Sequence, residues 1–168
     1  MDIFKGIKPM AIIVCRKKRS PISWWIRWRT GDEWSHVCLV GRDNTIFTTT
    51  RKGYALVRAD EYLKDREYEV LEMELPDERI RAGFKFNHEL IGTPYSYTDF
   101  GRLILRNLKG KGTKGMKNNS KNVYCAESVA ETYRAMGITL FEQTGKKPNE
   151  MLPADCGLDH RLKLKLKK

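Results

Sequence analysis

Cys125 is the residue of this sequence whose position most clearly allows chemistry. It follows Asn122, which can cap a helix, and it lies in the first turn of a segment whose apolar residues recur at helical spacing until Gly137. Unpaired amides and the helix dipole at such a start favour a thiolate, and the same amides can donate to the oxyanion of a tetrahedral intermediate. A buried cysteine that only fills the core is the alternative interpretation.

A thiol hydrolase also needs an imidazole that accepts and returns a proton. His36 opens the strand-like run WSHVCLVG, where its side chain can leave the sheet edge toward a helix packed across the sheet. His88 lies near the end of a charged helix and His160 beside a basic tail, which is typical of surface positions. The sequence therefore favours His36 as the general base, and a strand histidine without catalytic use is the alternative.

His36 and Cys38 alternate on one predicted strand and so share a face, which also allows metal binding. No Cys-x-x-Cys or His-x-x-x-His spacing supplies further ligands, so tetrahedral zinc would need Cys15 or Cys156 from distant segments. We therefore expect no metal and no other cofactor.

The elements that must position these groups predict an α+β fold with a small antiparallel sheet packed against helices. β-rich runs separated by turn signals predict its strands, at 11–14, 36–40, 45–50, 54–58 and 68–75. Helical spacing predicts the helices, at 77–89, 99–108 and 122–136. The last of these helices, 122–136, would then present Cys125 to His36 on the sheet.

A further short helix is predicted after Ser20-Pro21, an N-cap followed by a first-turn proline. Its apolar side carries Ile22 and three tryptophans, while its arginines face away, and it reads PISWWIRWR. This pattern suits either the edge of a core or a membrane interface. Of these two, we expect the core.

The length of 168 residues and the apolar fraction of 40% fit one domain, placed here at 1–160, with a basic tail at 161–168. The net charge of +11 concentrates in that tail and in a Gly-rich stretch that carries Lys109, Lys111, Lys114, Lys117 and Lys121. Such clusters favour an anionic partner, either a membrane surface or nucleic acid, or else only solubilise the chain. The tail, RLKLKLKK, fits either a strand or a disordered segment.

The apolar run near the start, 10–14, is too short for an export signal or a membrane span. We therefore expect a cytoplasmic protein, peripheral at a membrane if its basic segments bind one. In that reducing compartment the cysteines are expected to be free thiols.

Taken together, four segments resemble the circularly permuted branch of the NlpC-type papain-like cysteine hydrolases, which includes YiiX-like proteins and is related to lecithin retinol acyltransferase-like enzymes. The segments are WSHVCLVG with TIFTTT, YALVRADEYL, IGTPYSY and VYCAESVAETYRAMGI. They span most of the chain in the family's order, with histidine first and cysteine last.

This resemblance implies that Cys125 is the nucleophile, that His36 is the base and that no cofactor is needed. It matches Glu127 to the acidic residue that often follows the nucleophile, and Tyr95 to the tyrosine of the Gly-x-Pro-Tyr segment. The third catalytic position falls on Thr48, where the family often has a histidine, a glutamate or another polar residue. A hydroxyl can accept a hydrogen bond from imidazole but cannot stabilise imidazolium as a carboxylate does.

Three interpretations of this departure remain open. The pair acts without an ionic third member, Glu127 or Glu33 substitutes for it, or the site binds without turnover. As an enzyme, the protein would cleave an amide, peptide or ester bond through a thiol acyl-enzyme, with cell-wall peptides or amides slightly ahead of acyl lipids as substrates. The rival is a binding module on the same fold, using its basic segments and tryptophans on anionic membrane or nucleic acid.

Overall fold

A six-stranded antiparallel sheet forms the centre of the protein, in the order β4-β3-β2-β1-β5-β6. The computed structural model describes residues 3–108, 122–140, 142 and 145–168. The strands are β1 (Ile12–Lys17), β2 (His36–Val40), β3 (Thr45–Thr50), β4 (Gly53–Arg58), β5 (Arg66–Glu72) and β6 (Lys163–Lys167). The helices are α1 (Pro21–Thr30), α2 (Ala59–Tyr62), α3 (Asp77–Leu90), α4 (Tyr97–Leu108) and α5 (Cys125–Ala135), with short 3-10 turns at Pro148–Glu150 and Asp155–Gly157. The predicted α+β class is confirmed.

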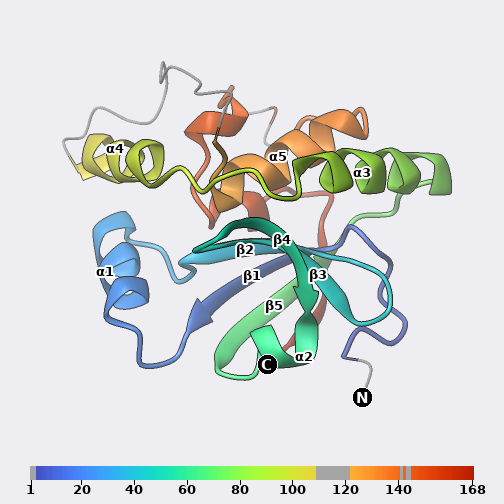
Figure 1. Cartoon of the computed structure of the whole chain (residues 1–168), viewed down its shortest axis with the longest axis horizontal. Coiled ribbons are helices and arrows are strands. Elements are labelled where there is room, and N and C mark those ends of the chain that lie inside the picture. The colour runs from blue at the N-terminus through green and yellow to red at the C-terminus, as the bar shows by residue number, and fades with distance from the viewer. Residues whose placement is uncertain (1–2, 109–121, 141, 143–144) are drawn as a thin grey trace.

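The helices divide between the two faces of the sheet, with α3 and α5 above it and α2 below it in the view of Figure 1. Alternate side chains of each strand feed two apolar clusters. Val37 and Leu39 of β2 pack in the larger cluster, which includes Cys125, whereas Cys38 and Val40 pack in the smaller one on the α2 side. The sheet is therefore buried on both faces, and α5 lies across β2.

The turn between β2 and β3 shows why these strands form a tight hairpin. Asp43 and Asn44 both have positive φ, of 50° and 56°, which short polar side chains tolerate better than others. The turn ends where the Gly41 amide donates to the Thr45 carbonyl at 2.8 Å. Its tightness fixes the register that sets residues of β3 beside β2.

Helix α1 corrects the expectation that its tryptophans belong to the core. The helix begins as predicted, with the Ser20 hydroxyl accepting a hydrogen bond from the Ser23 amide. However, its buried residues are Ser23 and Ile26, while Trp24, Trp25 and Trp28 are exposed. The small residue on the inner side allows the helix to pack closely, and the bulky rings point outward.

The C-terminal segment 161–168 contains a strand rather than a disordered tail. Residues Lys163–Lys167 pair with β5 as the edge strand β6, and Leu166 packs against the smaller cluster. The lysines of β6 are ion-paired along β5 and the residues after it, at Lys163–Glu74, Lys165–Glu72 and Lys167–Glu69. These positive charges are therefore already matched by carboxylates of β5 and of the segment that follows it.

Lys109, Lys111, Lys114 and Lys117, expected to bind an anionic surface, lie outside the described residues. Within the described part of the chain, no helix has both the length and the apolar character needed to cross a membrane.

Candidate active site

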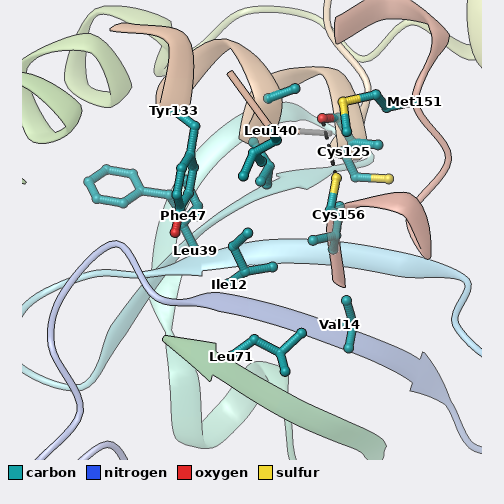
Figure 2. Packing of buried hydrophobic residues seen from close by; sticks show 14 of the residues in the cluster. Ile12, Val14, Leu39, Phe47, Leu71, Cys125, Tyr133, Leu140, Met151 and Cys156 are labelled. Carbon is teal, nitrogen blue, oxygen red and sulfur yellow. Dashed lines mark hydrogen bonds between the residues drawn. The ribbon is translucent and has the colours of Figure 1, made fainter. Parts of the chain in front are cut away.

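Cys125 is the first residue of α5 and lies against the start of β2 (Figure 2). Its sulfur accepts hydrogen bonds from the backbone amides of Val37 and Ala126. The Val37 amide is available because the paired stretch of β2 and β3 begins only at Leu39 and Phe47. The thiol therefore sits where a strand end and a helix start both present N–H groups, the arrangement that an oxyanion requires.

Burial nevertheless dominates the thiol's acidity. Cys125 is only 1% exposed, and desolvation raises its pKa to about 12 although the amides act in the opposite direction. The expectation that the helix start favours a thiolate is thus right about the amides, which lower the pKa of the thiol. It is wrong about the net effect, because the rise caused by burial is larger. In this closed arrangement the thiol is neutral.

The imidazole of His36 is fixed through its Nε2 atom. This nitrogen lies 2.8 Å from Oγ1 of Thr48 and 3.0 Å from the hydroxyl of Tyr62, and those two hydroxyls are 3.3 Å apart. The structure thus brings Thr48 to His36, as the matching of the hairpins predicts. Both contacts use Nε2, so Nδ1 is the ring nitrogen that would have to exchange a proton with a thiol.

Tyr62 was not singled out from the sequence, although it lies in the segment YALVRADEYL. It ends the four-residue helix α2, which begins where β4 stops and turns the phenol back toward the sheet. A helix of one turn has too little periodicity to be oriented from sequence. The only available signal was a tyrosine within a segment that resembles the family.

The charge around His36 disfavours its protonated form. Burial, followed by the positive charge of Arg66, lowers the pKa of His36 to about 3. Arg66 is held close by, with its guanidinium 4.1 Å above the Tyr62 ring and its Nε donating to the Tyr62 carbonyl at 3.0 Å. The imidazole is therefore neutral at physiological pH and can accept a proton.

His36 and Cys125 are connected through the backbone rather than through their side chains. In the part of the chain that the structure describes, no hydrogen bond joins the imidazole to the thiol. Instead the thiol binds the amide of Val37, the residue that directly follows His36. The predicted pair thus lies at the same end of β2, but the imidazole contacts Thr48 of β3 and Tyr62 of α2 and has no direct hydrogen bond to the thiol.

Tyr95 lies beside this pair because its segment binds the residues just before α5. The Ser96 amide donates to the Val123 carbonyl at 3.0 Å, and the Val123 amide donates to the Pro94 carbonyl at 3.1 Å. Burial, with the neighbouring Cys125 as the next contribution, raises the pKa of Tyr95. Its phenol is thus a neutral hydrogen-bonding group close to the thiol.

Neither predicted acidic substitute reaches His36. Glu127 is buried, and its carboxylate accepts a hydrogen bond from the Tyr124 amide, so it serves the start of α5. Burial raises its pKa to about 7. Glu33 is exposed and forms an ion pair with Arg16 at 3.3 Å. Neither glutamate therefore provides a negatively charged third member beside the imidazole.

A cleft of about 430 Å³ opens over His36, between α1, α4 and the start of β2. Its apolar wall includes Ile22, Ile26, Tyr95, Tyr97 and Phe100, and its cationic groups are Lys17, Arg51 and Arg66. His36 and Tyr62 line the cleft, whereas Cys125 is buried and does not line it. A larger cavity of about 630 Å³ beside α5 has no histidine or cysteine in its wall and does not include this site.

No group of three or more histidine, cysteine, aspartate or glutamate side chains that could hold a metal ion occurs among the described residues. Cys15 and Cys38, the sulfur groups nearest in strand position to His36, are buried in the smaller cluster and contact each other. The donor set around His36 consists of hydroxyls, which alone do not make a zinc site.

No family model matches this chain, and no curated protein matches it. Among solved structures it is similar to the metalloprotein YiiX of Escherichia coli O157:H7, with a TM-score of 0.72 and 18% sequence identity. The likeness covers 96% of this chain and 97% of that one. At this identity it shows the fold alone, so the chain has a YiiX-like α+β fold.

Proposed function

We propose that this YiiX-like domain is a permuted papain-like cysteine hydrolase that cleaves an amide, peptide or ester bond through a thiol acyl-enzyme. The observation that carries this proposal is that Cys125 and His36 lie at the same end of β2, where the thiol contacts the amide of the residue that follows His36. There the thiol rests on the amides of Val37 and Ala126, and a hydroxyl pair orients the neutral imidazole. A nucleophile, a base and oxyanion donors thus come from one small region.

The neutral resting pair indicates that proton transfer accompanies attack. With Nε2–H donating to Thr48, the lone pair of Nδ1 accepts the thiol proton while the sulfur forms a bond to the substrate carbonyl carbon. The amides at the start of α5 hold the resulting oxyanion. The imidazolium then protonates the leaving group as the carbonyl bond to that group breaks, and water releases the acyl group from the sulfur.

The substrate must enter through the cleft above His36. Its aromatic and aliphatic wall suits an apolar group, and Lys17, Arg51 and Arg66 suit a neighbouring anionic group. Because Cys125 is buried and does not line the cleft, turnover requires the side chains around the thiol to separate when substrate binds. We propose cell-wall peptides or amides as the first substrates to examine, with acyl lipids as the second.

A binding module without turnover is the second candidate. The observation that favours it is the buried thiol with a pKa of about 12, beside an imidazole that no carboxylate supports. In that function the cleft would bind the same ligands, and Cys125 would only fill the core.

Acylation of the intact protein separates these two functions. Incubation with a p-nitrophenyl ester, followed by mass spectrometry of peptides, should locate an acyl group on Cys125 and release of nitrophenol. The Cys125→Ser and His36→Gln variants should both lose acylation while keeping the far-ultraviolet circular dichroism of the wild type. Cys156→Ser is the matched control, since Cys156 is equally buried and its thiol donates to the Ala126 carbonyl at 3.8 Å (Figure 2). Acylation that persists in folded Cys125→Ser would exclude the mechanism.

A further inference from the structure

The outer side of α1 carries an aromatic surface that nothing in the described part of the chain covers. Trp24 is 57% exposed, Trp28 is 60% exposed and Ile22 is 64% exposed. By helical spacing, the three tryptophans of α1 lie opposite its buried residues Ser23 and Ile26. We call Ile22, Trp24, Trp25 and Trp28 the tryptophan face.

The tryptophan rings of this face are held in a defined arrangement by contacts with one another and with an arginine. The rings of Trp24 and Trp28 are stacked, with centroids 5.7 Å apart and planes 6° apart. The Arg29 guanidinium lies 4.3 Å above the Trp28 ring and 5.8 Å from that of Trp25. Ordered rings lose little conformational entropy when a partner covers them.

The charge around this face has one sign. From residue 16 to residue 29 the sequence contains six arginines or lysines and no acidic residue. Arg16 and Lys17 are paired with carboxylates, but no ion pair joins Arg27 or Arg29 to a described acidic residue. Lys18 and Arg19 are exposed just before α1. The surface therefore combines aromatic rings with unneutralised positive charge.

We propose that α1 is a docking surface for an anionic lipid bilayer, with the tryptophan face in the interfacial region and the basic residues at the headgroups. Tryptophan is enriched at membrane interfaces, and helices that lie in this plane combine an apolar face with lysine and arginine. Each basic residue near an anionic membrane adds further attraction.

The alternative partner, single-stranded nucleic acid, fits the geometry less well. Base stacking needs an open ring face. Here Trp24 and Trp28 already cover one face of each other, and Arg29 covers Trp28 further. The exposed aliphatic side chain of Ile22 offers a base no stacking surface, whereas it suits an acyl region.

Docking by α1 would also orient the cleft over His36. Ile22 lines that cleft and also borders the surface formed by Pro21, Trp24 and Trp25. The cleft and the tryptophan face therefore meet at the start of α1. A bilayer bound to this helix would lie next to the cleft mouth, whether or not the site performs turnover.

Binding to vesicles tests the proposal on the whole chain. Co-sedimentation and the blue shift of tryptophan emission should show binding to vesicles of phosphatidylcholine and phosphatidylglycerol in equal parts, and weaker binding to phosphatidylcholine alone. The Trp24→Ser/Trp28→Ser variant should bind the anionic vesicles at least about tenfold more weakly, because binding scales with buried apolar area. Lys18→Gln/Arg19→Gln should weaken binding about fivefold per charge removed.

Leu158→Ser is the control for the loss of an exposed apolar side chain, since Leu158 is 70% exposed outside α1, and it should bind as the wild type does. Cys125→Ser should also bind normally, so a failure of docking is distinguishable from a failure of the proposed hydrolase function. Unchanged vesicle binding by a folded tryptophan variant would overturn the proposal. The proposal would also be overturned if the tryptophan variant lost oligonucleotide binding but not vesicle binding. The same holds if its only change were from a dimer to a monomer in solution.

Discussion

The hydroxyl of Thr48 holds the imidazole of His36, with Oγ1 placed 2.8 Å from Nε2. A hydroxyl orients the ring but brings no negative charge to stabilise imidazolium. The nearby Arg66 adds a positive charge that disfavours imidazolium further. The arrangement therefore positions a neutral base, and any imidazolium must be formed transiently.

Removing the Thr48 hydroxyl should impair orientation more than folding. We expect Thr48→Val to lower kcat about 10- to 100-fold, the effect of losing one positioning hydrogen bond of 1–3 kcal/mol, while Thr48→Ser stays within about threefold of wild type. Steady-state kinetics measure both. Thr49→Val is the stability control, because the buried Thr49 hydroxyl has no hydrogen-bond partner among the described residues. Equal kcat for Thr48→Val and wild type would remove Thr48 from the mechanism.

The depressed pKa of His36 predicts a loss of stability in acid. The folded imidazole has a pKa of about 3, while an unfolded histidine titrates near 6.5. Between these values the unfolded chain binds a proton that the folded chain does not. The free energy of unfolding should therefore fall as pH drops through this window, by at most about 1.4 kcal/mol per pH unit. Urea unfolding of His36→Gln should show a shallower decline, and identical slopes would contradict a neutral imidazole in the folded protein.

The raised pKa of Glu127 predicts the opposite trend in an overlapping window. Its folded carboxyl has a pKa of about 7, above its ordinary value of 4.5, so the folded state binds more protons between these values. This contribution to stability is present at low pH and is lost as pH rises, by at most about 1.4 kcal/mol per unit. Glu127→Gln should remove that dependence and raise the free energy of unfolding above pH 7 relative to wild type. A less stable variant there would mean that the ionised carboxylate is needed at the Tyr124 amide.

Alkylation reports the state of the thiol. With a pKa of about 12, Cys125 should react with iodoacetamide at a rate that rises continuously with pH and shows no plateau near neutrality. Mass spectrometry of tryptic peptides can follow each cysteine separately, with Cys156 as the buried comparison. This expectation differs from the one drawn from the sequence, in which the start of the helix favours a thiolate at Cys125. A plateau near pH 7 at Cys125 would indicate an ion pair with His36.

The two leucines of β6 provide a matched test of the terminal strand. Leu166 packs against the smaller cluster, whereas Leu164 is 54% exposed. We expect Leu166→Ser to lower the free energy of unfolding by about 1–2 kcal/mol and Leu164→Ser by less than about 0.5 kcal/mol. Thermal or urea unfolding measures both. Similar small effects would mean that β6 contributes little to the folded domain.

The elements that the sequence predicted well are those with local signals. Ser20-Pro21 marks the start of α1, and the turn residues before Thr45 mark the hairpin that brings Thr48 to His36. For α5, the helix begins at Cys125 itself and not at a cap by Asn122. The prediction that the thiol lies in the first turn is still correct, because moving the helix start from Asn122 to Cys125 keeps Cys125 within that turn.

The remaining features depend on packing, which local patterns do not encode. The periodicity of α1 shows two sides but not which one packs against the rest of the domain, and the smaller Ser23 is the residue that allows close approach. The contact of Tyr62 with His36 depends on how α2 folds back under the sheet. The balance that leaves Cys125 protonated depends on burial, which outweighs the amides that the sequence identified.

Strand β6 also determines how the sheet ends. An edge strand offers unpaired N–H and C=O groups on which a second chain can add a strand. Here that edge carries Lys163, Lys165 and Lys167, charged side chains of the kind that disfavour strand addition, although each is ion-paired with a nearby glutamate. Loss of the last residues would instead expose β5, with the apolar Val70 and Leu71, as the new edge. The basic C-terminus thus protects the domain against intermolecular strand addition and aggregation.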